Sequence, residues 1–169
     1  TEGADGSTVE VGFTVIRARF DLFPEGRIQT LTHLSPEHLW QDRYIVRENG
    51  IRSLVEVVYS VDDPAASAGR LATFTGRPAA ETGPGREIAL DRGRLSFPLP
   101  DDIPPLYGFQ PVPDAPPPAA IGFTSADLAR TRAFFDARDI RLASDHPDRL
   151  VVAPEEALGA ALIVYTENS

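Results

Sequence analysis

The stretch QTLTHLSPEHLW, residues 29–40, gathers the side chains best suited to chemistry in this chain. It holds His33, Glu37, a second histidine and Trp40, the only tryptophan. Imidazole and carboxylate groups bind divalent metals and exchange protons near neutral pH. The same letters also describe a helix start, with Ser35 as N-cap, proline at the first helical position and Glu37 in the first turn. The sequence alone leaves both interpretations open.

A second chemical candidate is Glu56, which lies inside the apolar run SLVEVVYSV, residues 53–61. Its neighbours Val55 and Val57 alternate with Glu56 and Val58, so apolar side chains fall on both faces of the expected strand. A carboxylate in such a strand needs a partner, because burying an unpaired charge is costly. The pattern predicts that Glu56 binds a ligand or faces a polar cavity.

Composition narrows the chemistry that remains. The chain has no cysteine and no methionine, and all 16 of its cationic residues are arginines. Thiol nucleophiles, disulfides, cysteine metal sites and Schiff-base lysines are therefore excluded. The net charge is −9 and the arginines are scattered, whereas binding to a nucleic-acid backbone needs a positive face. We expect no nucleic-acid partner.

The chain is 42% apolar, which is enough for a real core, yet no apolar run approaches the roughly 20 residues of a membrane span. Its acidic start, TEGADGST, does not resemble an export signal, so we expect a cytoplasmic protein without membrane contact. Because residue 1 is threonine, we also expect that the chain is a trimmed product or the C-terminal part of a longer protein.

Secondary-structure patterns predict an α+β protein with five parts. Helix signals follow strand signals twice, each time with an aspartate before the helix. The expected parts are the last strands of an incomplete module (9–34), a connecting helix and loop (35–52), a β-α-β-β(-β) module (53–99), a proline-rich linker (100–118) and a β-α-β-β-β module (119–166).

The two later parts repeat one pattern. Shifting the chain by 64 residues aligns Val57 with Ile121 and Asp63 with Asp127. A shared order of strand, capping aspartate, helix and hairpin indicates a repeated β-α-β-β-β unit. Two copies can share a core that neither would form alone. We therefore expect curved mixed sheets with helices on their outer face.

The repeat and the string THLSPEHLWQDRYIVRENGIRSLVEVVYSVDDPAA (residues 32–66) resemble the glyoxalase-like branch of the vicinal oxygen chelate superfamily. That superfamily includes glyoxalase I, extradiol ring-cleaving dioxygenases and bleomycin-resistance proteins. The likeness covers about residues 10 to 166. It implies a cup-shaped sheet whose ligand-binding residues come from the first and last strands of the modules.

On this resemblance, His33 and Glu56 are the predicted metal ligands, because Glu56 occupies the first-strand position where many members carry a metal-binding histidine. The matching position of the last module is Ala120, which cannot bind a metal. Two ligands fall short of the three that catalytic divalent metals usually take. The resemblance implies that a segment upstream of residue 1, or another subunit, completes the site.

The first functional hypothesis is a metal-dependent isomerase, lyase or dioxygenase acting on a small oxygen-bearing substrate. A divalent ion (zinc, nickel, manganese or iron) would stabilise an enolate-like or oxyanion state. Glu37 would transfer the proton. Alternatively, Glu37 is an acidic residue of the first helical turn and takes no part in catalysis. The second hypothesis is a non-catalytic protein that sequesters small molecules, like the drug-binding relatives.

Four further residues are candidates for the substrate pocket: Trp40, Arg43, Tyr44 and Phe97. The aromatic side chains would line an apolar wall, or else simply belong to the core. Arg43 would pair with a substrate carboxylate, or with an acidic residue at the surface. Because an incomplete leading module leaves a strand edge unpaired, we also expect a homodimer or association with a missing N-terminal segment.

Overall fold

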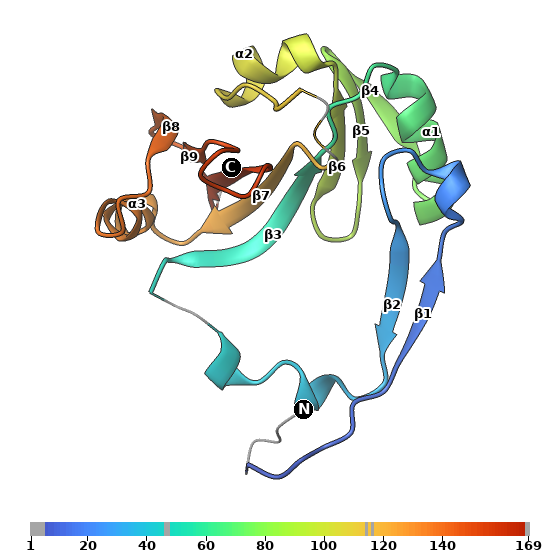
Figure 1. Cartoon of the computed structure of the whole chain (residues 1–169), viewed down its shortest axis with the longest axis vertical. Helices are drawn as coiled ribbons and strands as arrows, with labels where there is room; N and C mark the ends of the chain where they lie inside the picture. The colour runs from blue at the N-terminus through green and yellow to red at the C-terminus, as the bar shows by residue number, and fades with distance from the viewer. Residues whose placement is uncertain (1–5, 46–47, 114, 116, 168–169) are drawn as a thin grey trace. The chain divides into compact units, whose positions relative to one another are not determined.

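The structure, a computed structural model, describes residues 6–45, 48–113, 115 and 117–167. It divides into two compact units, Thr1–Arg47 and Glu48–Ser169 (Figure 1). Residues 46, 47, 114 and 116, which belong to the two predicted connecting segments, lie outside the described residues.

The first unit is built on a two-stranded hairpin. β1 (Phe13–Arg17) pairs antiparallel with β2 (Gln29–His33), and Phe13 lies opposite His33. The connection contains a short 3-10 helix, Phe20–Leu22, and a turn in which the Gly26 N–H donates to the Phe23 carbonyl at 3.2 Å. Gly26 has a φ of +119°, a conformation that favours glycine.

The expected helix start after His33 is a single 3-10 turn, Pro36–His38, and a second such turn follows at Asp42–Tyr44. Ser35 does not cap it with its side chain. Instead the Ser35 hydroxyl accepts a hydrogen bond from the Gly12 N–H at 3.0 Å and joins the end of the hairpin to its beginning. Gln41 donates its side-chain amide to the His38 carbonyl at 2.7 Å, so a side chain satisfies a group that a longer helix would bond internally.

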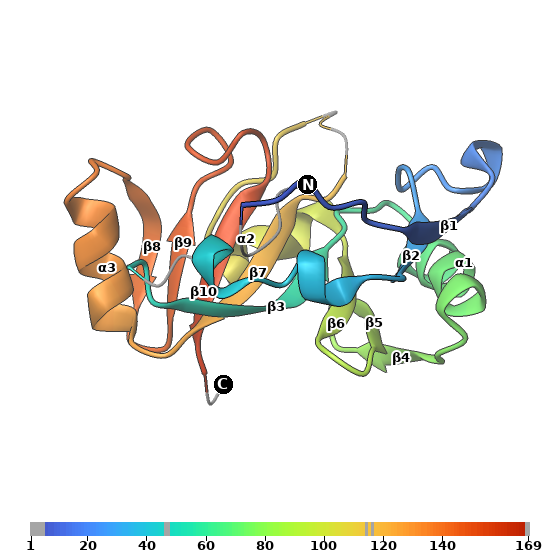
Figure 2. The same cartoon turned by 90° about the horizontal axis from the view of Figure 1, so that it is seen from below.

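The second unit contains an eight-stranded mixed sheet with the order β4-β5-β6-β3-β7-β10-β9-β8. Each module pairs its first strand with its last in parallel, β3 with β6 and β7 with β10, and antiparallel β3–β7 pairing joins the modules (Figure 2). The first module has β3 (Ile51–Val58), α1 (Pro64–Thr75), β4 (Ala79–Thr82), β5 (Gly85–Ala89) and β6 (Arg94–Pro98); the second has β7 (Ala120–Ser125), α3 (Leu128–Asp136), β8 (Leu142–His146), β9 (Arg149–Val152) and β10 (Ala161–Thr166).

This arrangement confirms the predicted α+β fold of repeated β-α-β-β-β modules. Val57 and Ile121, equated by the 64-residue shift, face each other across the β3–β7 ladder. An antiparallel pair of equivalent residues marks a local two-fold axis between the modules. Both helices begin at a capping aspartate: Asp63 accepts from the Ala66 N–H, and Asp127 accepts from two backbone N–H groups.

The two sheet faces are covered by different helices. α1 packs on β5 and β6, and α3 packs on β9 and β10, so they cover what we call the outer face. Leu128 and Phe135 of α3 form an apolar cluster there with side chains of β9 and β10. The opposite, inner face carries a second apolar cluster that includes Val58, Ala120 and Ile163.

The inner face is partly covered by α2 (Ile103–Tyr107), a short helix within the segment predicted to be a linker. Pro104 and Pro105 fall in its first turn, where a missing N–H leaves no helical bond unmade, so the proline-rich sequence is compatible with a helix. Ile103 and Phe109 are buried in the inner cluster. The segment therefore contributes to the core as well as connecting the modules.

Within the residues described, no helix is both long enough and apolar enough to cross a membrane; the longest, α1, has 12 residues.

Candidate functional site

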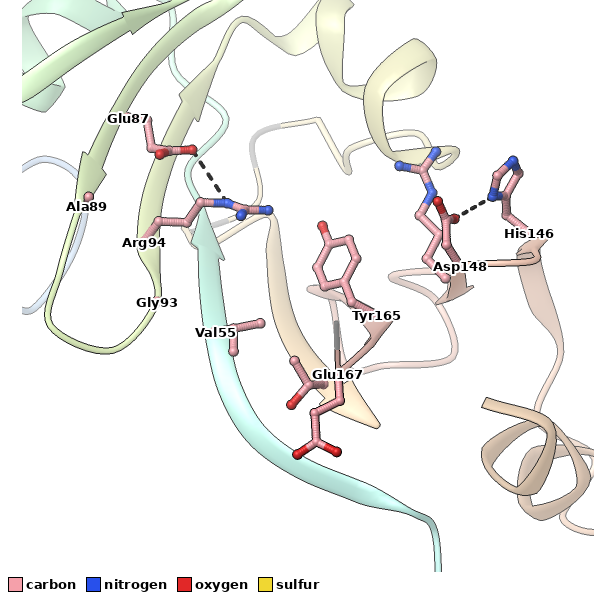
Figure 3. Close-up of a pocket in the computed structure, with 11 residues that line it drawn as sticks. Val55, Glu87, Ala89, Gly93, Arg94, His146, Asp148, Tyr165 and Glu167 are labelled. Atoms are coloured by element: carbon pink, nitrogen blue, oxygen red, sulfur yellow. Dashed lines mark hydrogen bonds and ion pairs between the residues drawn. The ribbon is translucent and has the colours of Figure 1, made fainter. Parts of the chain in front are cut away.

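Glu56 reaches the inner face at an irregular point of β3. Leu54 lies opposite Phe123 and Glu56 lies opposite Gly122, so one extra residue, Val55, is inserted between them. Such a bulge breaks the strict alternation of side chains. Val55 consequently lines the same inner-face pocket as the residues around Glu56 (Figure 3).

From the part of the chain that the structure describes, the Glu56 carboxylate accepts five hydrogen bonds donated by four side chains. On Oε1 the donors are Arg94 Nε at 3.1 Å, the Ser96 hydroxyl at 2.6 Å and the Tyr107 hydroxyl at 3.0 Å. On Oε2 they are Arg94 Nη2 at 3.1 Å and the Tyr165 hydroxyl at 2.7 Å. Only 1% of the Glu56 side chain is exposed. We call these five residues the Glu56 cluster.

Elements far apart in the chain bring this cluster together. Arg94 lies directly beside Glu56 because the parallel β3–β6 register pairs the two residues, and Ser96 follows two positions along the same face of β6. Tyr107 is the last residue of α2, and Tyr165 comes from β10 of the other module. The buried carboxylate therefore has the partners that its apolar strand required.

Electrostatics hold this cluster in one protonation state. Burial alone raises the pKa of Glu56, but hydrogen bonds from Arg94, Ser96 and Tyr165 and the charge of Arg94 outweigh it, so the pKa lies below its ordinary value. Burial and the nearby Glu56 charge raise the pKa of both Tyr107 and Tyr165. Glu56 is therefore ionised at neutral pH and both phenols are neutral donors.

Gly122 makes room for this contact. A Cβ at this position would lie 2.9 Å from the Glu56 Cβ and 3.1 Å from Cε2 of Tyr165. A side chain at Gly122 would therefore push Glu56 and Tyr165 apart. The second module thus provides the space that the charged group of the first module occupies.

A pocket with a volume of about 600 Å³ lies beside the Glu56 cluster on the inner face (Figure 3). Tyr165 and Arg94 border it from the cluster side, and Nε of Arg94 also lies 3.5 Å from a Glu87 oxygen. At the other side His146 contacts Asp148 through Nδ1. Other charged and polar residues of its lining are Thr124, Arg149 and Glu167.

The structure places the predicted site residues in two groups. In the first unit the His33 ring meets the Trp40 ring edge-on, with 5.8 Å between ring centroids. In the second unit Glu56 lies in its cluster. Because His33 and Glu56 belong to different units, their joint binding of one metal stays a prediction.

The other predicted residues of the first unit lie mostly at its surface. Glu37 is 3.7 Å from Nε2 of the neighbouring histidine, and 65% of its side chain is exposed. Trp40 and Tyr44 are 73% and 53% exposed, and the Arg43 guanidinium lies 4.8 Å from the centre of the Tyr44 ring. Their roles in proton transfer and substrate binding stay predictions.

Phe97 is buried in the second unit. Arg94 and Ser96 point to the inner face, so strand alternation turns Phe97 away from them. Its ring stacks on Tyr59 with 5.5 Å between centroids. Phe97 also borders a smaller cavity of about 190 Å³ next to Tyr107.

Sequence reasoning did not identify the partners of Glu56 or the other residues that line the inner-face pocket. One signal was present: a buried carboxylate requires a cation, and Arg94 begins the last strand of the same module. Tyr107 and Tyr165 carry no such signal. His146, the last residue of β8, also lines the pocket.

The residues around Glu56 do not fit the divalent metal that the fold resemblance implies. Both carboxylate oxygens already accept hydrogen bonds, and the Arg94 guanidinium would repel a cation at that position. Across the described part of the chain, no group of three or more histidine, aspartate or glutamate side chains is arranged to hold a metal ion.

Comparison with known proteins supports the fold. No protein-family model matches the sequence, and no curated protein matches it either. Among solved structures, methylmalonyl-CoA epimerase from Mycobacterium tuberculosis superposes with a TM-score of 0.51 and 14% identity, over 75% of this chain and 95% of the epimerase. At that identity the likeness shows the fold alone.

Two other solved structures superpose more loosely. One is lactoylglutathione lyase from Agrobacterium tumefaciens, with 18% identity, 69% and 94% coverage of this chain and the lyase, and a TM-score of 0.30. The other is a glyoxalase/bleomycin resistance protein/dioxygenase from Nocardioides, with 16% identity, 80% and 95% coverage, and a TM-score of 0.31.

Proposed function

We propose that this chain, which has the glyoxalase-like fold of the vicinal oxygen chelate superfamily, binds a small polar organic molecule in the inner-face pocket without a metal held by Glu56. One observation carries the proposal. At the position where the resemblance put a metal ligand, Glu56 instead forms a two-pronged ion pair with Arg94 and accepts three further hydrogen bonds.

The Glu56 cluster is better suited to shaping a pocket than to chemistry. An ionised carboxylate whose lone pairs are all engaged is a weak base, since taking a proton would break several of its bonds. Neutral tyrosines already donating to Glu56 offer no second proton to a ligand. Satisfied polar networks of this kind hold side chains rigidly, so Tyr165 and Arg94 form a pre-organised pocket wall.

The pocket itself has the properties of a ligand site. Its volume of about 600 Å³ falls within the usual 300–1,000 Å³ of small-molecule pockets. It offers an aromatic ring from Tyr165, small apolar surfaces from Val55 and Ala89, and a hydroxyl from Thr124. A small ligand with both an apolar and a polar part would match this lining.

The metal-dependent enzyme is the alternative. For His33 and Glu56 to hold a zinc, nickel, manganese or iron ion, the Glu56 carboxylate would first have to leave Arg94. Removing one partner from a buried ion pair typically costs about 3–5 kcal/mol, which metal binding would have to offset. The proposed binding protein requires no such rearrangement.

Ligand-detected NMR with a set of small aromatic alcohols, amides, amines and acids tests the proposal. Ala89→Trp would fill the pocket from an exposed position, and Ala79→Trp, on the exposed strand β4, is its matched control. We expect at least one compound to bind saturably to the native protein and to the control, and to lose binding to Ala89→Trp. Equal binding to both variants would place the ligand elsewhere and contradict the proposal.

Elemental analysis of protein purified without chelator tests the alternative. We expect no stoichiometric divalent metal. One equivalent of zinc, nickel, manganese or iron that is lost in both His33→Ala and Glu56→Gln, with both variants folded, would favour the metal-dependent enzyme instead.

The predicted homodimer also belongs to this proposal. Isolated two-stranded hairpins are marginally stable in water, and the hairpin of the first unit carries exposed apolar side chains such as Ile16 and Phe20. Association through this unit would cover them. Light scattering after size-exclusion chromatography should show about twice the chain mass of 18.3 kDa, and Ile16→Asp should shift it to the monomer.

A further inference from the structure

We propose that Arg149 is the anion-recognising residue of the inner-face pocket and that the ligand is a small organic acid whose carboxylate it binds. This inference rests on the proposed function, since it names the chemical class of the molecule that the pocket takes. It depends on three observations: how the protein holds Arg149, what its neighbour Arg94 is already bound to, and what lies opposite Arg149 in the sheet.

The protein orients the Arg149 guanidinium without neutralising it. Arg149 begins β9, and its Nη1 donates to the Leu106 carbonyl at 2.6 Å. A carbonyl carries no net charge, so this bond fixes the guanidinium without supplying a counter-charge. Among the described residues, Nε of Arg149 is buried without a hydrogen-bond partner. A guanidinium has five N–H donors, and this one is poorly supplied with acceptors.

The comparison with Arg94 shows what is unusual about Arg149. Both arginines line the pocket, but Arg94 bonds to both oxygens of Glu56 and lies 3.5 Å from Glu87. Its charge is thus compensated within the protein. The acid next to Arg149 in sequence, Asp148, is in contact with His146, although the Arg149 charge also lowers its pKa. Of the two pocket arginines, Arg149 is the one that the protein leaves to pair with a ligand.

The position opposite Arg149 suits the rest of such a ligand. Tyr165 is its direct partner in the β9–β10 ladder, so both side chains leave the sheet on the inner face, and both line the pocket. Because the Tyr165 hydroxyl is engaged with Glu56, what this residue offers to the pocket is the apolar surface of its ring. Glu87 and Glu167 also line the pocket and would repel a doubly charged phosphate more than a singly charged carboxylate.

Three probes of matched shape test this inference: benzoate, benzamide and benzylamine. They share an aromatic ring and differ in carrying a negative, a neutral or a positive group. We expect benzoate to bind saturably in a protein-detected NMR titration at pH 7. Its affinity should be at least about tenfold higher than that of the other two probes, because a hydrogen bond between charged groups contributes more binding free energy than a neutral one. The resonances that shift should include those of β9 and β10.

Variants locate the effect at Arg149. Arg149→Gln should weaken benzoate binding about tenfold or more, whereas Arg141→Gln should not change it. Arg141 is a matched control because it pairs with Glu156 outside the pocket and 86% of its side chain is exposed. Since Arg149→Gln also loses the bond to Leu106, its thermal unfolding is measured alongside. Arg149→Lys, which keeps the charge, should retain part of the affinity.

The outcomes separate this inference from the proposed function. If benzamide or benzylamine binds in the pocket as tightly as benzoate, the anion preference is wrong while small-molecule binding stands. Unchanged benzoate affinity in folded Arg149→Gln also overturns the role of Arg149 alone. If none of the three probes binds and the wider compound set fails as well, both proposals are overturned.

Discussion

The two modules of the second unit share one backbone plan and differ in what they place on the inner face. The first and last strands of the first module carry Glu56, Arg94 and Ser96 there. The corresponding strands of the second module carry Ala120, Gly122 and Ile163, with Tyr165 towards the strand end. One module supplies a charge pair and the other supplies space and a phenol.

This difference shows that strands in equivalent positions of the two modules can carry side chains of quite different chemistry. The parallel register of β3 and β6 brings together the opposite charges of Glu56 and Arg94, which satisfy each other. The small residues of β7 then allow the charge pair and Tyr165 to meet. A site on a familiar scaffold has to be judged from the partners of each side chain.

The largest expected effect comes from removing the charge of the first module. Glu56→Gln leaves Arg94 without its main partner and presents an amide to the donors of Ser96 and the two tyrosines. We expect the free energy of unfolding at pH 7 to fall by about 3 kcal/mol, as for other broken buried pairs. Urea unfolding followed by circular dichroism measures this.

The matched control for that substitution is Glu87→Gln, which removes a carboxylate 3.5 Å from the same arginine but is itself partly exposed. We expect a change of about 0.5 kcal/mol or less. Similar losses of unfolding free energy in the two variants would mean that the burial of Glu56 adds nothing to the stabilisation by its ion pair.

The same pair predicts a pH dependence. The pKa of Glu56 is lowered on folding from its ordinary 4.5, so its stabilising contribution is complete above pH 4.5 and is lost as the pH falls through the folded-state pKa. The stability gap between the native protein and Glu56→Gln should therefore stay constant from pH 7 to about pH 5 and narrow below it. Urea midpoints at several pH values test this; a gap that widens in acid would contradict the assignment.

A smaller effect is expected from filling the space in the second module. Gly122→Ala adds a Cβ 2.9 Å from that of Glu56 and should lower the free energy of unfolding by about 1–3 kcal/mol through overpacking. Gly69→Ala is the control, because no atom lies within 4 Å of its added Cβ and it sits in the interior of α1. That variant should gain about 0.5–1 kcal/mol of stability. Thermal unfolding of both compares them directly.

The smallest expected effects concern the two helix caps, where the modules agree. Asp127 accepts from the N–H groups of Ala129 and Arg130, while the cap bond described for the Asp63 side chain is the one from the Ala66 N–H. Asp127→Ala and Asp63→Ala should each cost about 1 kcal/mol, with the larger loss at Asp127. Chemical denaturation of both variants measures the difference, and a larger loss at Asp63 would show that cap bonds do not set the ranking.

Much of the scaffold followed from local pattern. The capping aspartates, the hairpin from β5 to β6 and the 64-residue repeat were all visible in the sequence, and the fold they predict is confirmed. The need for a partner at Glu56 was also visible, because a charge in an apolar strand is costly. These features depend on residues close together in the chain or on composition within one strand.

The sequence by itself therefore determined the modules, their helix starts and the presence of a buried carboxylate that had to be satisfied. Only the tertiary structure decided that Arg94, Tyr107 and Tyr165 satisfy it, that α2 packs into the inner face, and that Arg149 faces the pocket with a carbonyl as its partner. The physical reason is that parallel pairing, a strand bulge and the return of a distant strand bring together residues up to 109 positions apart. The local periodicity of the sequence does not indicate which residues this far apart come into contact.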